Sequence, residues 1–104
     1  KKIKNAARNK HAQMEKVLVQ KYGRKAFDAM EDFRPYIGMP EGIVREYKVV
    51  MKDVNFIAYG FVRVENGYKV YLPTRLFAMT ASYINARFPR AIYTKNGKVA
   101  AIKW

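Results

Sequence analysis

The sequence contains no cysteine, one histidine and few acidic residues. Without cysteine there are no disulfides, no thiolate catalysis and no thiolate-bound zinc. A single histidine leaves no histidine-rich metal site. The longest stretch without a charged residue, 76–86, is far shorter than the ~20 residues of a membrane-spanning helix. We therefore expect no membrane partner, and a protein that is not secreted but lies in a reducing intracellular compartment or inside a virion.

Positive charge is what the sequence has in excess. Its 104 residues include 21 Lys and Arg against 8 Asp and Glu, a formal net charge of +13. Residues 1–25 hold nine basic residues and one acid, residues 26–65 hold five and seven, and residues 66–104 hold seven and none. Two basic segments around a near-neutral centre are typical of a surface that binds a polyanion. We expect the partner to be nucleic acid, DNA or RNA, or an acidic protein surface.

The spacing of apolar residues predicts one α+β domain over residues 1–104. Apolar residues three and four apart predict a helix from Ile3 to Tyr22 and a second helix from Arg24 to Asp32. Together they make a basic helical N-terminal element, residues 1–34. A loop rich in proline and glycine separates this element from a β-rich core, residues 43–104, that ends in a hairpin.

The predicted order for the whole chain is ααβββαββ, with one helix packed on an antiparallel sheet. Asn-Gly at 66–67 and 96–97 predicts type I′ turns, which need positive φ at both positions. A two-residue turn at 66–67 pairs Arg63 with Val70 and Phe61 with Leu72. A further turn is expected at 53–55. The strands are expected at 43–51, 56–65, 68–72, 91–95 and 98–104. Between the third and fourth strands we expect a helix that is capped by Thr74 and ended by Pro89. Its packed face is expected to consist of Phe77, Ala81, Ile84 and Phe88.

Catalytic and cofactor motifs are absent: no nucleophile elbow, no HExxH, no P-loop and no dinucleotide-binding glycines. His11 and Glu15 are four residues apart and can meet on one helical face, which we interpret as an exposed polar pair. We predict no catalytic residue, no metal ligand and no cofactor. A small metal-free ribonuclease that uses Lys, Arg and Tyr is the enzymatic alternative.

Tyrosines are interleaved with basic residues in the β-rich core, and exposed aromatic rings stack on unpaired bases. Residues 59–62, Tyr-Gly-Phe-Val, match the middle of a known eight-residue pattern of glycine and aromatic residues. The residues at 57, 58 and 64 do not match that pattern. The segment resembles the first ribonucleoprotein signature of RNA-recognition-motif domains. The resemblance implies that Tyr59 and Phe61 stack on bases from one face of a strand.

These patterns together predict a non-catalytic nucleic-acid-binding protein. Lys95 and Lys98 flank the 96–97 turn, where paired like charges destabilise a hairpin and favour an external anion. We expect this turn to act as a wing, with Arg87 and Arg90 beside it. The alternatives are a basic subunit of a larger assembly (ribosomal, organellar ribosomal or phage virion protein) and a small inhibitor that docks on an acidic protein surface. The candidate binding residues are Lys4, Arg8, Lys16, Tyr59, Phe61, Arg75, Arg87, Arg90, Lys95 and Lys98.

Overall fold

The computed structural model describes the backbone of residues 2–51 and 54–104 and the side chains of residues 9–51 and 54–104. Over these residues the chain forms four helices, a two-stranded β-ribbon and a sheet of four strands. The predicted α+β class is therefore confirmed. The sheet is antiparallel with the order β3-β4-β5-β6, and β1 pairs with β2 in the ribbon. The elements are α1 (Lys2–Tyr22), α2 (Arg24–Glu31), α3 (Glu41–Glu46), β1 (Lys48–Val50), β2 (Asn55–Ile57), β3 (Tyr59–Glu65), β4 (Tyr68–Pro73), α4 (Arg75–Tyr83), β5 (Ala91–Lys95) and β6 (Lys98–Lys103).

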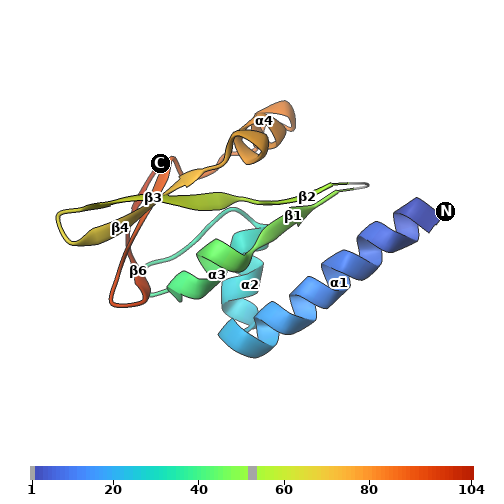
Figure 1. Ribbon diagram of the computed structural model, residues 1–104, viewed down its shortest axis with the longest axis horizontal. Coiled ribbons are helices and arrows are strands. Elements are labelled where there is room, and N and C mark those ends of the chain that lie inside the picture. The colour runs from blue at the N-terminus through green and yellow to red at the C-terminus, as the bar shows by residue number, and fades with distance from the viewer. Residues whose placement is uncertain (1, 52–53) are drawn as a thin grey trace.

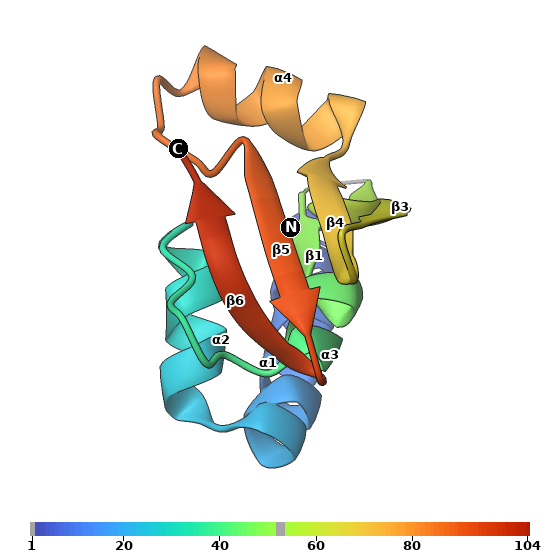
Figure 2. The ribbon, with the colours of Figure 1, turned by 90° about the vertical axis from the view of Figure 1, so that its left-hand side faces the viewer.

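The β1–β2 ribbon lies between α1 on one side and α4 on the other (Figure 1). α2 and α3 lie on the same side of the ribbon as α1. α4 crosses the end of the sheet at which β5 begins and β6 ends (Figure 2). The molecule measures 48 × 30 × 19 Å, because α1 and the β3–β4 hairpin extend in opposite directions.

The core is built where α2 and α3 cover the sheet face that carries Tyr71 and Ile92, which are paired across β4 and β5. Phe27 of α2 is 1% exposed and Ile43 of α3 is fully buried. Removing such side chains from water is the main favourable term in folding. α4 joins this core through Phe77, whose ring centroid lies 4.9 Å from that of Phe33.

The segment 43–51 is not the single strand that the sequence predicts. Residues 41–46 form α3, and only Lys48–Val50 form a strand. Ile43 and Val44 are β-branched, which favours strands, but both are 0% exposed. Packing of these two side chains into the core therefore outweighs their local preference. Pro40 precedes the helix, and Glu41 in its first turn suits the positive end of the helix dipole.

Both Asn-Gly turns are confirmed, with positive φ at all four positions, from 53° to 84°. Arg63 pairs with Val70 as predicted, but Phe61 pairs with Tyr71 instead of Leu72. A β-bulge between Phe61 and Arg63 adds one residue to β3 and shifts the register beyond it. No pattern in the local sequence predicts this extra residue.

α4 begins as predicted and ends earlier. The Thr74 hydroxyl oxygen accepts a hydrogen bond from the Phe77 N–H at 3.4 Å and so caps the helix. The helix stops at Tyr83, because Asn85 has a φ of 57° and lets the Ala86 N–H donate to the Ala81 carbonyl at 2.8 Å. The predicted packed stripe is therefore wrong at Ile84, which is 60% exposed.

The predicted strand 56–65 is interrupted at Ala58, where the backbone N–H donates to the Tyr47 carbonyl. Residues before Ala58 pair with β1, and residues after it pair with β4. One extended segment thus serves both the ribbon and the sheet. The turn expected at 53–55 begins at Asp53, which lies outside the described residues.

Gly42 of α3 is packed against the ring of Tyr22 from α1. A Cβ added at Gly42 would lie 2.6 Å from Cζ and 2.8 Å from Cε1 of that ring. We predict that Gly42→Ala lowers the free energy of unfolding by about 1–3 kcal/mol, because overpacking forces the tyrosine out of its place. Urea denaturation measures the loss.

Gly60→Ala is the matched control, since an added Cβ there meets only the Thr74 methyl group at 3.8 Å. Gly60 lies in β3, where alanine is expected to cost nothing and to reduce the entropy of the unfolded chain. Equal stability losses in the two variants would contradict the tight α1–α3 contact.

Candidate functional site

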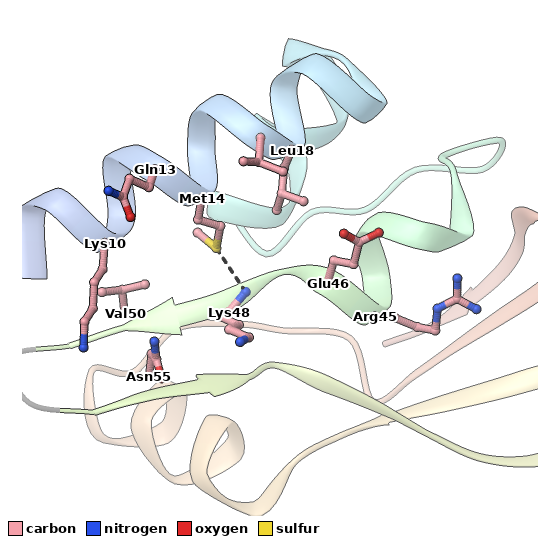
Figure 3. Close-up of a pocket in the computed structure, with 10 residues that line it drawn as sticks. Lys10, Gln13, Met14, Leu18, Arg45, Glu46, Lys48, Val50 and Asn55 are labelled. Atoms are coloured by element: carbon pink, nitrogen blue, oxygen red, sulfur yellow. Dashed lines mark hydrogen bonds between the residues drawn. The ribbon is translucent and has the colours of Figure 1, made fainter.

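A groove of about 580 Å³ runs between α1 and the β1–β2 ribbon (Figure 3). Met14 and Leu18 of α1 form part of its apolar floor. The polar side chains of the lining come from α1, α3 and both strands of the ribbon. They are Lys10, Gln13, Arg45, Glu46, Lys48 and Asn55.

Two contacts of α1 fix the walls of the groove. The Lys48 backbone N–H donates to Sδ of Met14 at 3.3 Å, which attaches β1 to the helix. Leu18, one turn further along α1, is 2% exposed and anchors the helix in the core. From these anchors the Lys10 side chain extends from α1 towards β1, and Lys48 lies on the facing wall (Figure 3).

The groove is electrostatically positive. Within the described part of the chain, no carboxylate lies within ion-pair distance of Lys10, Arg45 or Lys48. Glu46, the carboxylate in the lining, is held by Lys21 at 2.8 Å and by the Tyr22 hydroxyl. The hydrogen bond from Lys21, followed by that from Tyr22, lowers the pKa of Glu46, so its charge is compensated from outside the groove.

Tyrosine hydroxyls bind two further glutamates, the partly buried Glu31 and the buried Glu41. Tyr47 donates to Glu31 at 2.5 Å, and Tyr71 donates to Glu41 at 2.5 Å. Burial, with the hydrogen bond to Glu41, raises the pKa of Tyr71 to about 12. The tyrosine therefore acts as a neutral donor at physiological pH. Glu41 also lies 3.7 Å from the ammonium of the exposed Lys69, so this carboxylate partly compensates one cation outside the groove.

The single histidine meets Glu15 on one face of α1, as its spacing predicts, and it also links two helices. Nε2 of His11 lies 2.9 Å from Oε1 of Glu31 on α2, whereas Nδ1 lies 3.9 Å from Oε1 of Glu15. The imidazole is partly buried and packs edge-on against Phe27, with the ring centroids 6.0 Å apart. Its contacts join α1 to α2.

Lys16 is the one predicted binding residue of α1 whose side chain the structure describes, and it does not line the groove. The side chains of Lys4 and Arg8 lie outside the described residues, although their backbone belongs to α1. Lys16 is exposed and borders a different hollow, on the side of α1 that also carries Glu15. Arg75 is exposed at the first position of α4, on the far side of the ribbon.

The wing predicted at the last hairpin is wrong in placing Arg87 and Arg90 beside the turn, whereas the phosphate contacts predicted for Lys95 and Lys98 stay a prediction. Lys95 pairs with Lys98 as expected, but the turn is attached to the segment before α3: the Glu41 N–H donates to the Gly97 carbonyl at 2.8 Å. Arg87 and Arg90 precede β5, at the opposite end of a strand that spans about 13 Å. The four cations therefore make two separate sites.

Arg87 and Arg90 are each held over an aromatic ring. The Arg87 guanidinium carbon lies 5.2 Å from the centroid of Trp104, and that of Arg90 lies 5.2 Å from Phe88. Such contacts stabilise the cation by ~0.5–1 kcal/mol at exposed sites. Both arginines keep their donors available to an anion, but neither reaches the groove.

The ring of Tyr59 is buried and cannot stack on a base. It is 2% exposed, and its hydroxyl donates to the Pro89 carbonyl at 2.8 Å. Burial raises its pKa. The stacking role that the ribonucleoprotein-like segment implies for Tyr59 is therefore wrong. Phe61 is 52% exposed on the edge strand, edge-on to Tyr71, and stays a candidate contact.

The groove is not evident from the sequence because its cations come from different charge segments. Arg45 and Lys48 lie in the near-neutral centre, residues 26–65, and Lys10 lies 38 residues from Lys48. One signal was present in the sequence: Lys10 interrupts the apolar stripe that continues with Met14 and Leu18. A lysine on a packed face points to a cavity or cleft at that position.

Comparison with protein-family models, with curated proteins and with solved structures finds no match for this chain, so the argument rests on its own geometry. Over residues 2–51 and 54–104, no three His, Asp or Glu side chains converge as metal ligands would. In the same ranges no helix has the length and apolar character needed to cross a membrane.

Truncation separates the core role of Tyr59 from the surface position of Phe61. We predict that Tyr59→Ala lowers the free energy of unfolding by about 3–5 kcal/mol, because it leaves a cavity and an unpaired Pro89 carbonyl. Phe61→Ala should cost about 1 kcal/mol, the value of its exposed edge-on contact. Urea denaturation of both variants gives the comparison, and a loss for Tyr59 as small as that for Phe61 would contradict its burial.

Proposed function

We propose that the chain is a non-catalytic nucleic-acid-binding protein, and that the groove between α1 and the ribbon holds a phosphate backbone. The observation that carries the proposal is that Lys10 and Lys48 line one groove, with Arg45 at its far end, and that none of the three has a carboxylate partner among the described residues (Figure 3). Phosphate contacts supply most of the affinity of sequence-independent nucleic-acid binding.

Both walls of the groove carry a lysine. Lys10 comes from α1 and Lys48 from β1, and the nearby carboxylate of Glu46 is occupied by Lys21. An external anion between the walls would be attracted to both lysines. The fold thus supports a ligand of negative charge better than it supports an empty groove.

The remaining lining suits a nucleic-acid strand better than a small anion. Gln13 and Asn55 supply amide donors and acceptors for phosphate, sugar or base edges. Val17 is 51% exposed at the groove, so an apolar surface is available to sugars and base faces. The net charge of +13 adds long-range attraction that steers a polyanion to the surface.

A double substitution in the groove tests the proposal. We predict that Lys10→Gln with Lys48→Gln weakens binding to DNA and RNA and makes it less sensitive to salt. Loss of two phosphate contacts should reduce the slope of log K against log salt by about 1.4 on single strands and about 1.8 on duplex DNA. Gel shifts at several salt concentrations measure both quantities.

Lys25→Gln with Lys103→Gln is the matched control, since it removes the same charge from exposed positions outside the groove. We expect this variant to keep most of its affinity and nearly the parent slope. If the two double variants lose affinity equally, binding depends on total charge and the groove has no special role.

A further inference from the structure

α4 carries apolar side chains on two sides. Phe77 and Ala81 are buried against the core, with exposures of 1% and 0%. On the other side Leu76 is 51% exposed, Met79 is 61% exposed and Tyr83 is 92% exposed. A helix that is apolar all round is normally buried. The outer face of α4 is thus apolar without being covered by the rest of the described chain.

The spacing of the exposed residues is that of a docking helix. Leu76, Met79 and Tyr83 stand at positions i, i+3 and i+7, with Thr80 at i+4, so their side chains share one face of α4. Amphipathic helices that lie in apolar grooves use anchors at these positions. Tyrosine is also enriched among the residues that dominate binding energy at interfaces.

The charges around this face indicate the chemistry of the partner. Arg75 is the first residue of α4, and Arg87 follows its end, while residues 66–104 contain no acid. Among the ion pairs of the described residues, neither arginine is engaged. A partner with carboxylates at the rim of an apolar groove complements both ends of the helix.

A second copy of the chain fits this face poorly. Antiparallel contact of two α4 helices would place Arg75 of one copy near Arg87 of the other, and each copy has a net charge of +13. Like charges brought together across an interface cost several kcal/mol. Self-association through α4 is therefore disfavoured by the same charges that favour an acidic partner.

We propose that α4 docks into an apolar groove of an acidic protein, with Leu76, Met79 and Tyr83 as anchors and with carboxylates facing Arg75 and Arg87. This surface is independent of the phosphate groove, because α4 and α1 lie on opposite sides of the β1–β2 ribbon (Figure 1). The chain would then hold a nucleic acid on one side and an acidic protein on the other.

Calcium-loaded calmodulin is a suitable probe, since it is acidic and opens a methionine-rich apolar groove for basic amphipathic helices. Its calcium-free form serves as the control, because it is also acidic but keeps the groove closed. Calorimetry should show binding to the calcium-loaded form only. Met79→Gln with Tyr83→Gln should weaken this binding about tenfold or more.

Ile37→Gln with Val62→Gln is the matched variant, because these residues are 62% and 48% exposed away from α4. It should bind the probe like the parent. Absence of calcium-dependent binding, or binding that Met79 and Tyr83 do not affect, would overturn the proposal. So would dimerisation through α4 in sedimentation, or capture by phosphatidylglycerol vesicles in place of the probe.

Gel shifts distinguish this proposal from the proposed function. The variant with Met79→Gln and Tyr83→Gln keeps Lys10 and Lys48, so it should retain nucleic-acid binding whether or not α4 docks. Loss of nucleic-acid binding in this variant, with an intact circular dichroism spectrum, would overturn the independence of the two surfaces.

Discussion

Hydrogen bonds from tyrosine hydroxyls to glutamates hold the helices of this protein to one another and to the sheet. Each pair joins elements that are distant in the sequence. Glu41 is buried, whereas the side chains of Glu31 and Glu46 are about a third exposed. Because a buried carboxylate without partners is costly, the bond from Tyr71 is needed where Glu41 packs against the sheet. Lys21 and Lys69 add ion pairs to Glu46 and Glu41. The pairs are Tyr22–Glu46, Tyr47–Glu31 and Tyr71–Glu41.

The groove follows from this arrangement of α1 against α3. Tyr22 and Lys21 at the end of α1 both reach Glu46 at the end of α3, and β1 starts two residues later. The angle at which α1 leaves this contact sets the distance between Lys10 and the ribbon. The contact of Lys21 with Glu46 at the end of α1 therefore influences how far Lys10, nearer the start of α1, lies from Lys48. In this way local packing is connected to the proposed function.

Sequence patterns predicted the features that depend on neighbouring residues. The Asn-Gly turns, the Thr74 cap and the first two helices need only local backbone preferences, and all are present. α3 was missed because burial of Ile43 and Val44 overrides their strand preference. The tyrosines were misread for a similar reason: the partner of Tyr71 lies 30 residues away, and no spacing rule connects it to Glu41.

The uneven distribution of acids is consistent with two proposed binding surfaces on so small a chain. Glu15, Glu31, Glu41 and Glu46 are used in contacts between elements, and residues 66–104 contain no acid. Neither the groove nor the ends of α4 is therefore neutralised from within. What separates the two surfaces is their apolar content. The groove offers amides and flexible lysines, which suit a regular polyanion, whereas α4 offers Leu76, Met79 and Tyr83 in a fixed array, which suits a shaped protein groove.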